Sequence, residues 1–359
     1  MKTVACIVGA RPNFMKIAPI MASVAGSQKL RARLIHTGQH FSAEMSDAFF
    51  RDLSLPQPDE YLGVKPGTQT EQTASIMRAL EQSFSNHRPD LVVIVGDVTS
   101  TLSAALVAAK MEIPIAHVEA GLRSFDRRMP EEINRLVTDV LSDFLFVSEP
   151  SGVRNLKAEG IAEHKIFFVG NVMIDTLLRF RDRAMQSGIL TELGVAPKSY
   201  ILATLHRPSN VDDPAHLHDL AEMLNHLSDR HPVVFPVHPR TQQRLQENGN
   251  LRAGLILTPP LGYLDFVRLM ADARLVLTDS GGIQEETTIL TVPCLTLREN
   301  TERPVTVEVG TNRLVGTDPA TAYAAAIEAL DHSSKDGQVP ELWDGKASGR
   351  IVEILEREL

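Results

Sequence analysis

The chain has 359 residues, 43% apolar and 23% charged, which is enough apolar material for the cores of about two domains. Its net charge of −9 excludes a sequence-independent grip on nucleic acid, so any anionic ligand must be held by local arginines. No apolar stretch approaches the ~20 residues of a membrane span, and Cys6 and Cys294 fall inside predicted buried strands, as reduced thiols do. We therefore expect a soluble, cytoplasmic protein with no membrane or nucleic-acid partner.

Short apolar runs alternate with helical patterns along the whole chain. The predicted strands are 3–9, 32–37, 91–95, 114–119, 144–148 and 166–169, then 200–205, 233–238, 255–258, 274–279, 293–297 and 313–315. The predicted helices include 68–86, 99–111, 130–142, 213–230 and 318–331. Such alternation predicts βαβ units and parallel sheets, hence an α/β protein of two doubly wound domains, 1–170 and 171–345. An amphipathic helix, 346–359, is expected to pack back on the first domain.

The predicted strands end in chemically active residues. Ligands of open α/β sheets bind beyond the carboxyl ends of the strands. Here those ends read "VGARPNFMK", "HTGQH", "VGDVTST", "HVEAGLRS", "TLHRPSN", "VHPRT" and "TDSGGIQEE". A purely structural sheet can end in plain turn residues, so we interpret these ends as a ligand site.

The stretch "TDSGGIQEE" (278–286) predicts a phosphate site. Gly281 and Gly282 permit close backbone approach at a helix N-terminus, whose free N–H groups and dipole attract phosphate. Ser280 adds a hydroxyl, and Glu285 or Glu286 is placed to accept from ribose hydroxyls. The alternative is an ordinary helix start with acidic residues in its first turn.

Two further stretches offer cations for a diphosphate. "GARPNFMK" (9–16) places Arg11 at a strand end and Lys16 one helical turn on, with Pro12 suited to the start of the helix. "ENTERPVTVEVG" (299–310) is a charged loop whose Arg303 has the planar fork that suits phosphate. The alternative for each is a solvated basic side chain beside a strand.

Carboxylates gather in and before the stretch "HVEAGLRSFDRRMPEEINR" (117–135). Asp97 and Glu119 end consecutive predicted strands, so they can face one pocket, and Glu131 and Glu132 follow Pro130 at a predicted helix start. His206 ends the first strand of the second domain. The alternatives are a solvated charged loop and acids that merely favour a helix start.

Several familiar motifs are missing from the sequence. It has no G-x-G-x-x-G after a strand, no G-x-x-x-x-G-K-[ST], no H-E-x-x-H, no C-x-x-C and no G-x-S-x-G. We therefore predict that the protein uses no nicotinamide and no metal ion, and hence no cofactor.

The stretches quoted above, from "VGARPNFMK" to "ENTERPVTVEVG", occur in this chain together with "LGYLDF". In these stretches and their order, the sequence resembles the non-hydrolysing UDP-N-acetylglucosamine 2-epimerases over almost the whole chain. The resemblance implies two Rossmann-like domains of the GT-B type, an active site in the interdomain cleft, a UDP-sugar substrate and a homodimer. Asn13 departs from the family pattern, in which many members have Glu.

The resemblance also implies roles for particular residues. Asp97, Glu119 and Glu131 match the catalytic carboxylates, and His206 matches a histidine near the leaving diphosphate. The residues that match nucleotide or sugar contacts are Arg11, Lys16, His238, Ser280, Gly281, Gly282, Glu286 and Arg303, and Phe266 matches the aromatic residue beside uracil.

Chemistry restricts how such an enzyme inverts C2. That carbon is not next to a carbonyl, so its proton is not acidic, and transient oxidation would need a nicotinamide site. What remains is elimination of UDP to a bound 2-acetamidoglucal, followed by protonation from the opposite face and re-addition of UDP. The alternatives are a 2-epimerase for a UDP-2,3-diacetamido sugar or uronic acid, a GT-B glycosyltransferase, a hydrolysing epimerase and a nucleotide-sugar sensor.

Overall fold

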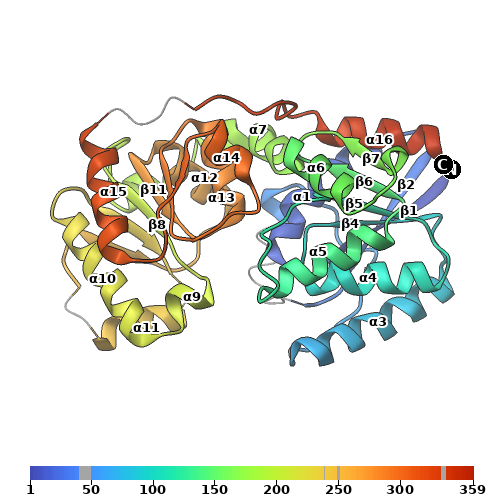
Figure 1. The fold of residues 1–359 in the computed structure, drawn as a ribbon, viewed down its shortest axis with the longest axis horizontal. Helices are drawn as coiled ribbons and strands as arrows, with labels where there is room; N and C mark the ends of the chain where they lie inside the picture. Colours follow the sequence, from blue (N-terminus) through green and yellow to red (C-terminus); the bar gives the residue numbers. More distant parts are fainter. Residues whose placement is uncertain (40–49, 238, 249–250, 333–336) are drawn as a thin grey trace. The chain divides into compact units, whose positions relative to one another are not determined.

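The computed structural model describes residues 1–39, 50–237, 239–248, 251–332 and 337–359 (Figure 1). The chain divides into two compact units: unit 1 is Met1–Arg179 with Glu341–Leu359, and unit 2 is Phe180–Pro340. Each unit holds its own parallel sheet with helices around it, which confirms the predicted α/β class with two doubly wound domains. The domain limits after residues 170 and 345 stay a prediction beside these unit limits.

Unit 1 is built on a seven-stranded sheet in the order β3-β2-β1-β4-β5-β6-β7. Its strands are β1 (Lys2–Val8), β2 (Leu30–His36), β3 (Glu60–Tyr61), β4 (Leu91–Val95), β5 (Ile115–Val118), β6 (Phe144–Val147) and β7 (Ile166–Phe168). Its helices are α1 (Arg11–Ala25), α3 (Gln69–Asn86), α4 (Thr99–Lys110), α5 (Pro130–Leu141), α6 (Pro150–Ala158), the 3-10 helix η1 (Glu163–Lys165) and α16 (Ala347–Glu358), while α7 (Val172–Ala184) crosses the unit limit.

The central strands of unit 1 are apolar because helices cover them. Every residue of β4 is fully buried, as expected for a parallel strand with both faces covered. One face of the sheet, with Ile7 and Ile94, packs against Leu80 of α3 and Ala104 of α4 in a single apolar cluster. This core holds the carboxyl ends of β1, β4 and β5 in fixed positions.

The last helix of the chain, α16, belongs to unit 1 (red in Figure 1). Its N-terminus is capped by Asp175 of α7, whose carboxylate accepts from the N–H groups of Ala347 at 3.1 Å and Ser348 at 2.7 Å. The Ser348 hydroxyl also bonds Ser23 of α1 at 3.1 Å. The indole of Trp343, just before α16, donates to the Ser148 carbonyl at 2.8 Å.

Unit 2 is built on a six-stranded sheet in the order β10-β9-β8-β11-β12-β13. Its strands are β8 (Ile201–Thr204), β9 (Val233–Pro236), β10 (Leu255–Thr258), β11 (Leu275–Thr278), β12 (Cys294–Thr296) and β13 (Asn312–Leu314). Its helices are α8 (Ile189–Glu192), α9 (Pro208–Val211), α10 (Pro214–Ser228), α11 (Pro239–Asn248), α12 (Tyr263–Asp272), α13 (Gly281–Leu290), α14 (Pro304–Glu308) and α15 (Pro319–Asp331). The face that carries Ile201 and Leu277 packs against α10 and α15.

Every predicted strand is present, with ends within two residues of the prediction. The strand β3 was not predicted, because two residues of mixed polarity form no apolar run. It sits at the sheet edge, where Glu60 pairs with Arg33 of β2 and accepts from the Ser83 hydroxyl at 2.5 Å. Among the residues that the structure describes, no helix is long and apolar enough to cross a membrane.

Candidate functional site

The site in unit 1 begins where β4 and β5 end side by side. The two strands are parallel neighbours, and their pairing closes with a bond from the Gly96 N–H to the Val118 carbonyl at 3.0 Å. Asp97 directly follows Gly96 and Glu119 directly follows Val118, so the two strand ends that carry these acids are neighbours. The sheet thus presents two acids at one edge, as ligand sites of open α/β sheets do.

Glu119 occupies an unusual backbone conformation. Its φ of +71° lies in the left-handed region, which is costly for a side chain that is not glycine. Its N–H bonds the Phe146 carbonyl of β6 at 3.0 Å, and its side chain is 3% exposed and forms an ion pair with Lys16 of α1. A β-carbon on Gly96 would lie 2.8 Å from Lys16 Nζ and 3.6 Å from Glu119 Oε2, so this ion pair rests directly against the residue before Asp97.

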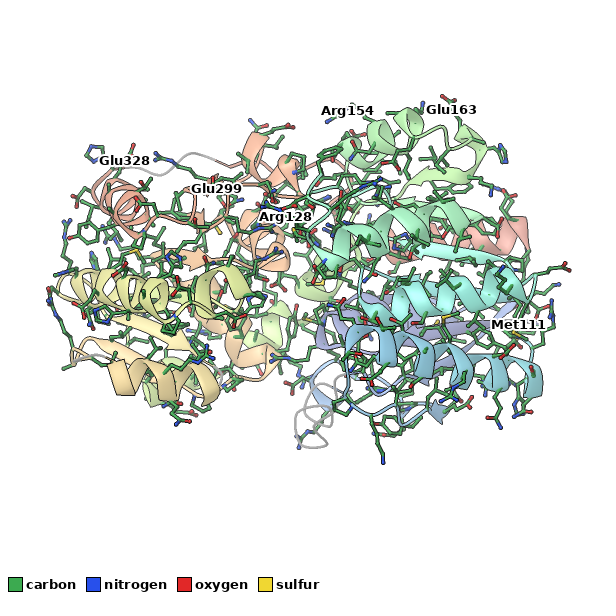
Figure 2. The ribbon with its side chains drawn as sticks, turned by 60° about the horizontal axis from the view of Figure 1, so that its bottom comes forward. Met111, Arg128, Arg154, Glu163, Glu299 and Glu328 are labelled. Carbon is green, nitrogen blue, oxygen red and sulfur yellow. The ribbon has the colours of Figure 1, made fainter. Side chains whose placement is uncertain are left out.

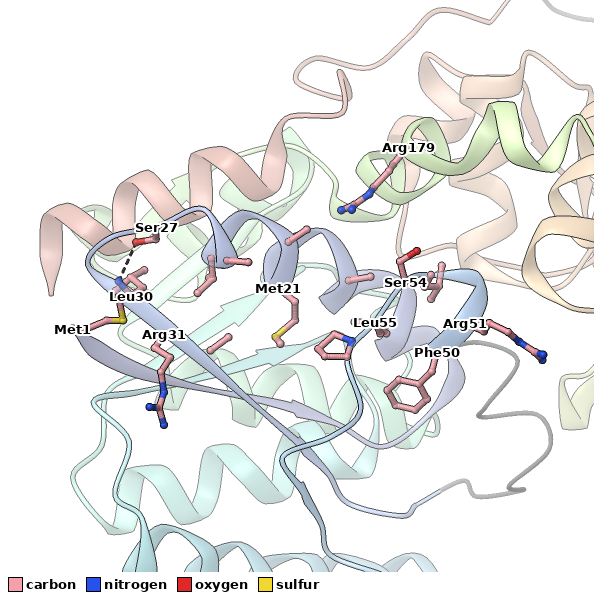
Figure 3. A pocket seen from close by; sticks show the side chains of 17 residues that line it. Met1, Met21, Ser27, Leu30, Arg31, Phe50, Arg51, Ser54, Leu55 and Arg179 are labelled. Carbon is pink, nitrogen blue, oxygen red and sulfur yellow. Dashed lines mark hydrogen bonds between the residues drawn. The ribbon is translucent and has the colours of Figure 1, made fainter.

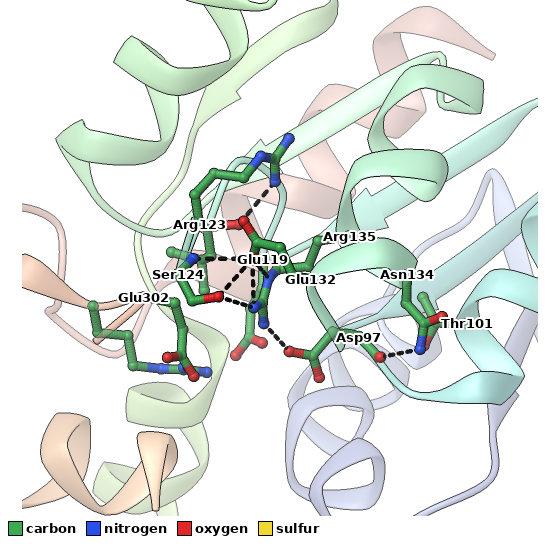
Figure 4. A network of polar contacts seen from close by, with 12 residues as sticks. Asp97, Thr101, Glu119, Arg123, Ser124, Glu132, Asn134, Arg135 and Glu302 are labelled. Atoms are coloured by element: carbon green, nitrogen blue, oxygen red, sulfur yellow. Dashed lines mark hydrogen bonds and ion pairs between the residues drawn. The ribbon is translucent and has the colours of Figure 1, made fainter. Parts of the chain in front are cut away.

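Asp97 is held by two side chains of α5 (Figure 4). Arg135 forms an ion pair with the Asp97 carboxylate, and Asn134 donates to its backbone carbonyl at 2.7 Å. The Arg135 side chain is buried, whereas that of Asp97 is partly exposed. A fixed cation and a fixed backbone therefore orient a carboxylate that solvent or a ligand can still contact.

The neighbouring acids Glu131 and Glu132 behave differently. Glu131 is exposed in the first turn of α5. Glu132 is buried, and it accepts from the N–H groups of Ser124 and Phe125, each at 2.9 Å, and pairs with Arg135 at 2.7 Å. These contacts of the Glu132 carboxylate thus stabilise the conformation of the loop that leads from Glu119 to α5.

The arginines of this loop have separate partners. Arg123 is buried and pairs with Asp139 at 2.7 Å and Glu159 at 2.6 Å. Arg128 pairs with Asp126 at the surface, with its own side chain 90% exposed (Figure 2). A solvated charged loop therefore describes residues 126–128 but not the buried charges on either side of them.

Asp139 and His117 form a buried pair behind the two strand ends. Their Oδ1 and Nδ1 atoms lie 2.6 Å apart, and both side chains are fully buried. Burial alone would raise the pKa of Asp139, but the charges and hydrogen bonds of His117 and Arg123 hold it below its ordinary value. Neither residue was singled out from the sequence, because nothing local marks a buried histidine and aspartate as partners across 22 residues.

The start of α1 explains the departure at Asn13. Its Oδ1 accepts from the N–H groups of Gly9 at 3.2 Å and Ala10 at 3.0 Å, and its Nδ2 donates to the Val95 carbonyl at 3.0 Å. This amide both accepts and donates, which a carboxylate cannot do. Arg11, two residues earlier, is exposed.

In unit 2, Asp279 and His206 meet at the ends of β11 and β8. Asp279 is fully buried and accepts from the N–H groups of His206 and Arg207, each at 2.9 Å. His206 Nδ1 lies 2.7 Å from Asp279 Oδ1, while the ring is 66% exposed. Burial alone would raise the pKa of Asp279, but His206 and the Arg207 N–H hold it below its ordinary value. Asp279 therefore fixes the ring and leaves Nε2 facing solvent.

The N-terminus of α13 immediately follows Asp279. No side chain caps it, and Ser280, Gly281 and Gly282 are partly exposed there. The Ser280 N–H donates to Thr278 Oγ1 at 3.0 Å, and the N–H groups of the first turn of α13, which begins at Gly281, have no side-chain cap from Ser280.

Arg303 packs against the first turn of α13. It is 6% exposed and pairs with Glu285 at 2.8 Å and Glu302 at 2.6 Å. A β-carbon on Gly281 would lie 2.5 Å from Arg303 Nη1, so the glycine makes room for the guanidinium. The sequence pattern alone did not reveal these two buried acidic partners.

The remaining predicted nucleotide contacts are spread over unit 2. Glu286 is buried and accepts from the Tyr263 hydroxyl at 3.1 Å. Burial raises the pKa of Glu286 to about 8. The hydrogen bond from Tyr263 lowers this pKa, and the charge of Glu285 raises it further. Phe266 is partly exposed on α12, and His238 lies outside the described residues.

Glu286→Gln is expected to stabilise the ligand-free protein increasingly as pH rises. The pKa of Glu286 is 4.5 when unfolded and about 8 when folded, so below pH 4.5 both states are protonated and the substitution changes little. As pH rises from 4.5 towards 8, only the unfolded wild type releases its proton, and wild-type stability falls relative to the variant. Urea unfolding of both proteins across this window measures the difference. If the difference in unfolding free energy between the two proteins stays constant from pH 4.5 to 8, the raised pKa of Glu286 is contradicted.

A groove lies elsewhere in unit 1 (Figure 3). It measures about 880 Å³ and is lined mainly by apolar side chains, including Met21, Leu30, Phe50 and Leu55. None of the predicted site residues lines it. Within the described ranges, no group of three or more His, Cys, Asp or Glu side chains is arranged to hold a metal ion.

The comparisons with known proteins agree with one another. Residues 22–356 match the family described as UDP-N-acetylglucosamine 2-epimerase. The chain is 42% identical to the UDP-N-acetylglucosamine 2-epimerase of Methanocaldococcus jannaschii, over 97% of each chain. It is 41% identical to the UDP-2,3-diacetamido-2,3-dideoxy-D-glucuronate 2-epimerase of Pseudomonas aeruginosa, over 98% of each.

Solved structures extend this agreement to the fold. A structure of the M. jannaschii UDP-GlcNAc 2-epimerase in complex with UDP-GlcNAc and UDP superposes with a TM-score of 0.91, at 41% identity over 99% of each chain. The glycotransferase of kitacinnamycin shares the fold alone, with a TM-score of 0.59 at 15% identity. With the family match covering nearly the whole sequence, the chain belongs to the UDP-N-acetylglucosamine 2-epimerase family.

Proposed function

We propose that this protein interconverts UDP-N-acetylglucosamine and UDP-N-acetylmannosamine by elimination and re-addition of UDP. The observation that carries the proposal is the pair of carboxylates at the ends of β4 and β5, each beside a fixed cation. Inversion at C2 needs a proton acceptor on one face of the sugar and a donor on the other. Asp97 and Glu119 supply two such groups in one place.

The reaction balances without a redox partner. A carboxylate takes the C2 proton while the bond between C1 and the diphosphate oxygen breaks, and the two carbons form the double bond of 2-acetamidoglucal. UDP leaves with the bonding electrons. A second carboxyl group then protonates C2 from the other face, and UDP re-forms its bond to C1. Glu131, exposed at the start of α5, is proposed as a third participant.

Lys16 and Arg135 are proposed to balance the charge of the two carboxylates. Each cation has a buried side chain and touches one of the acids. Each ion pair compensates the charge of a carboxylate when that group is ionised, before it accepts a proton or after it has given one up. Arg11, exposed at the start of α1, is proposed as a further contact to the substrate.

The diphosphate is assigned to unit 2. The N-terminus of α13 offers the N–H groups of Gly281 and Gly282, the hydroxyl of Ser280 and a favourable dipole. His206, whose ring is oriented by Asp279, is proposed to donate from Nε2 as the diphosphate takes on charge. Phe266, Glu286 and His238 are proposed contacts to the nucleoside.

Arg303 is proposed to act on the diphosphate through α13. Its guanidinium already has two acidic partners and packs under the glycines of the helix start. In this arrangement it orders the phosphate-binding turn. The homodimer expected from the family is proposed here as well.

A second candidate substrate is a UDP-2,3-diacetamido uronic acid. The relative from P. aeruginosa, which is named for that sugar, is 41% identical, beside 42% for the M. jannaschii enzyme. Overall identity therefore does not separate the two sugars. Both would undergo the same chemistry at C2.

Incubation with a single nucleotide sugar tests the proposal. Proton NMR of the protein with UDP-N-acetylglucosamine alone is expected to show a new anomeric signal from the manno epimer. A parallel reaction with the diacetamido uronate separates the two substrates, and added chelator is expected to leave the rate unchanged. A glycosyltransferase or a sensor would give no epimer, and a hydrolysing epimerase would accumulate free N-acetylmannosamine.

A further inference from the structure

A single buried carboxylate is linked to both turns that carry the proposed catalytic acids, to one directly and to the other through a histidine. Asp139 lies on α5 and is fully buried. Its Oδ2 accepts from the N–H of Gly121, two residues after Glu119, at 3.0 Å and from Arg123 at 2.7 Å. Its Oδ1 lies 2.6 Å from His117 Nδ1. One oxygen thus holds the turn after β5, and the other holds a histidine within β5.

His117 carries the contact on to the neighbouring turn. Its Nε2 lies 2.8 Å from the carbonyl oxygen of Gly96, the residue directly before Asp97. A carbonyl oxygen can only accept, so Nε2 donates to Gly96, while Nδ1 lies against the Asp139 carboxylate. The imidazole therefore ties the peptide that leads into Asp97 to the same carboxylate that holds the Glu119 turn.

We propose that Asp139 is a positioning residue for epimerisation, which sets the spacing between Asp97 and Glu119 by holding Gly121 directly and Gly96 through His117. The inference rests on the proposed function. Asp139 does not touch the substrate in this account. Its role is mechanical. Both turns use left-handed backbone, which is ordinary for Gly96 (φ +67°) but costly for Glu119 (φ +71°), so the Glu119 turn depends on the contacts that hold it.

The backbone bond from the Gly96 N–H to the Val118 carbonyl joins the two strand ends, and Asp139 adds a side-chain link that reaches beyond them to Gly121. Arg123 has a second acidic partner, Glu159, at 2.6 Å, so charge balance for the arginine does not depend on Asp139 alone. Asn134 and Arg135 of α5 hold Asp97 but do not bond the Gly121 N–H. Asp139 is the group that joins the two turns among these contacts.

Asp139→Asn is the direct test. An asparagine can keep its Oδ1 on Gly121 and Arg123 by turning its NH₂ group to His117, whose Nδ1 must then accept. The hydrogen bond to His117 loses the charge of the carboxylate and is weakened, so the link between the two turns holds the spacing of Asp97 and Glu119 less firmly. We expect kcat to fall by up to about 100-fold, since a displacement of about 1 Å can have that effect. KM and the dissociation constant of UDP are expected to stay the same.

The matched control is Asp175→Asn. Asp175 is also a buried helical aspartate of unit 1 that accepts from two backbone N–H groups, but those groups belong to α16. It is expected to lower stability without changing kcat. If the role of Asp139 is purely structural, Asp139→Asn should behave like this control, with lower stability and an unchanged kcat.

His117→Gln keeps the inference testable if Asp139→Asn does not fold. It leaves Asp139 with Arg123 and Gly121 and breaks the link to Gly96, because a glutamine has both N–H donors on one nitrogen and cannot span the two acceptors as the imidazole does. We expect a lower kcat with unchanged KM. In the double variant the losses should be less than additive, since both act through one chain of contacts.

A second measurement separates positioning from general damage. In deuterated water, misaligned carboxylates should release and return the C2 proton on one face more often, so deuterium uptake per inversion should rise in both variants. If folded Asp139→Asn or His117→Gln shows the wild-type kcat and the wild-type deuterium uptake per inversion, the inference about Asp139 is wrong and the proposed function still stands. A wild type inactive on both nucleotide sugars would overturn the proposed function and this inference with it.

Discussion

Asp97→Asn and Glu119→Gln are each expected to lower the rate of epimerisation by about two to four orders of magnitude. Each amide keeps the shape of the side chain but cannot accept a proton. The two residues end neighbouring strands and lie beside Arg135 and Lys16, so both serve the same sugar in the proposed reaction. Turnover is measured by NMR, and UDP binding by calorimetry. Binding is expected to persist.

The control for these variants is Glu163→Gln, because Glu163 pairs with Lys157 at the surface and contacts neither strand end. Glu131→Gln is expected to lose activity as well, whereas Glu132→Gln should lose stability, since its carboxylate folds the loop 124–125. Near wild-type turnover in Asp97→Asn or Glu119→Gln would remove that residue from the mechanism.

Arg303→Met is expected to destabilise the protein by about 3–5 kcal/mol. The guanidinium lies between Glu285 and Glu302, and all three side chains are nearly buried. Its removal leaves both carboxylates without this cation in a site where water cannot replace it. Glu302 would keep its contact with Arg298 at 2.7 Å, which limits the loss. Urea unfolding followed by fluorescence or circular dichroism measures the change.

Arg313→Met is the matched control in unit 2. Arg313 pairs with Glu328 at the same 2.7 Å, but both side chains are 57% exposed. Exposed pairs contribute little, so no measurable change in stability is expected. If Arg303→Met unfolds at the same urea concentration as the control yet binds UDP far more weakly, Arg303 contacts the diphosphate directly instead of ordering α13.

The strands, and the polar residues at their carboxyl ends, could be predicted because a local run of apolar residues marks each strand. Runs such as Leu91–Val95 are apolar throughout, and a parallel arrangement places every strand end at one edge of the sheet. The placement of Asp97 and Glu119 at neighbouring strand ends follows from that rule. The edge strand β3 could not be found this way, since Glu60 and Tyr61 give no periodic pattern.

The partners of the charged residues could not be predicted from the sequence. Whether Glu131 or Glu132 turns inward depends on the helical register of α5, and two adjacent glutamates look alike in a sequence. The contacts of Asp139 with His117 and of Arg303 with Glu285 join residues 22 and 18 positions apart. Such pairings arise from packing, which a local pattern does not contain. The location of the active site between the domains stays a prediction.

The most direct test of the account is the fate of the C2 hydrogen when UDP-N-acetylglucosamine is incubated with the protein in deuterated water. Elimination passes the C2 proton to a carboxylate and breaks the bond between C1 and oxygen. We therefore expect deuterium at C2 of both epimers, with isotope exchange between bridging and non-bridging oxygens of the β-phosphate. Conversion to the manno epimer with the C2 hydrogen fully retained would contradict elimination and the roles proposed for Asp97, Glu119 and Glu131.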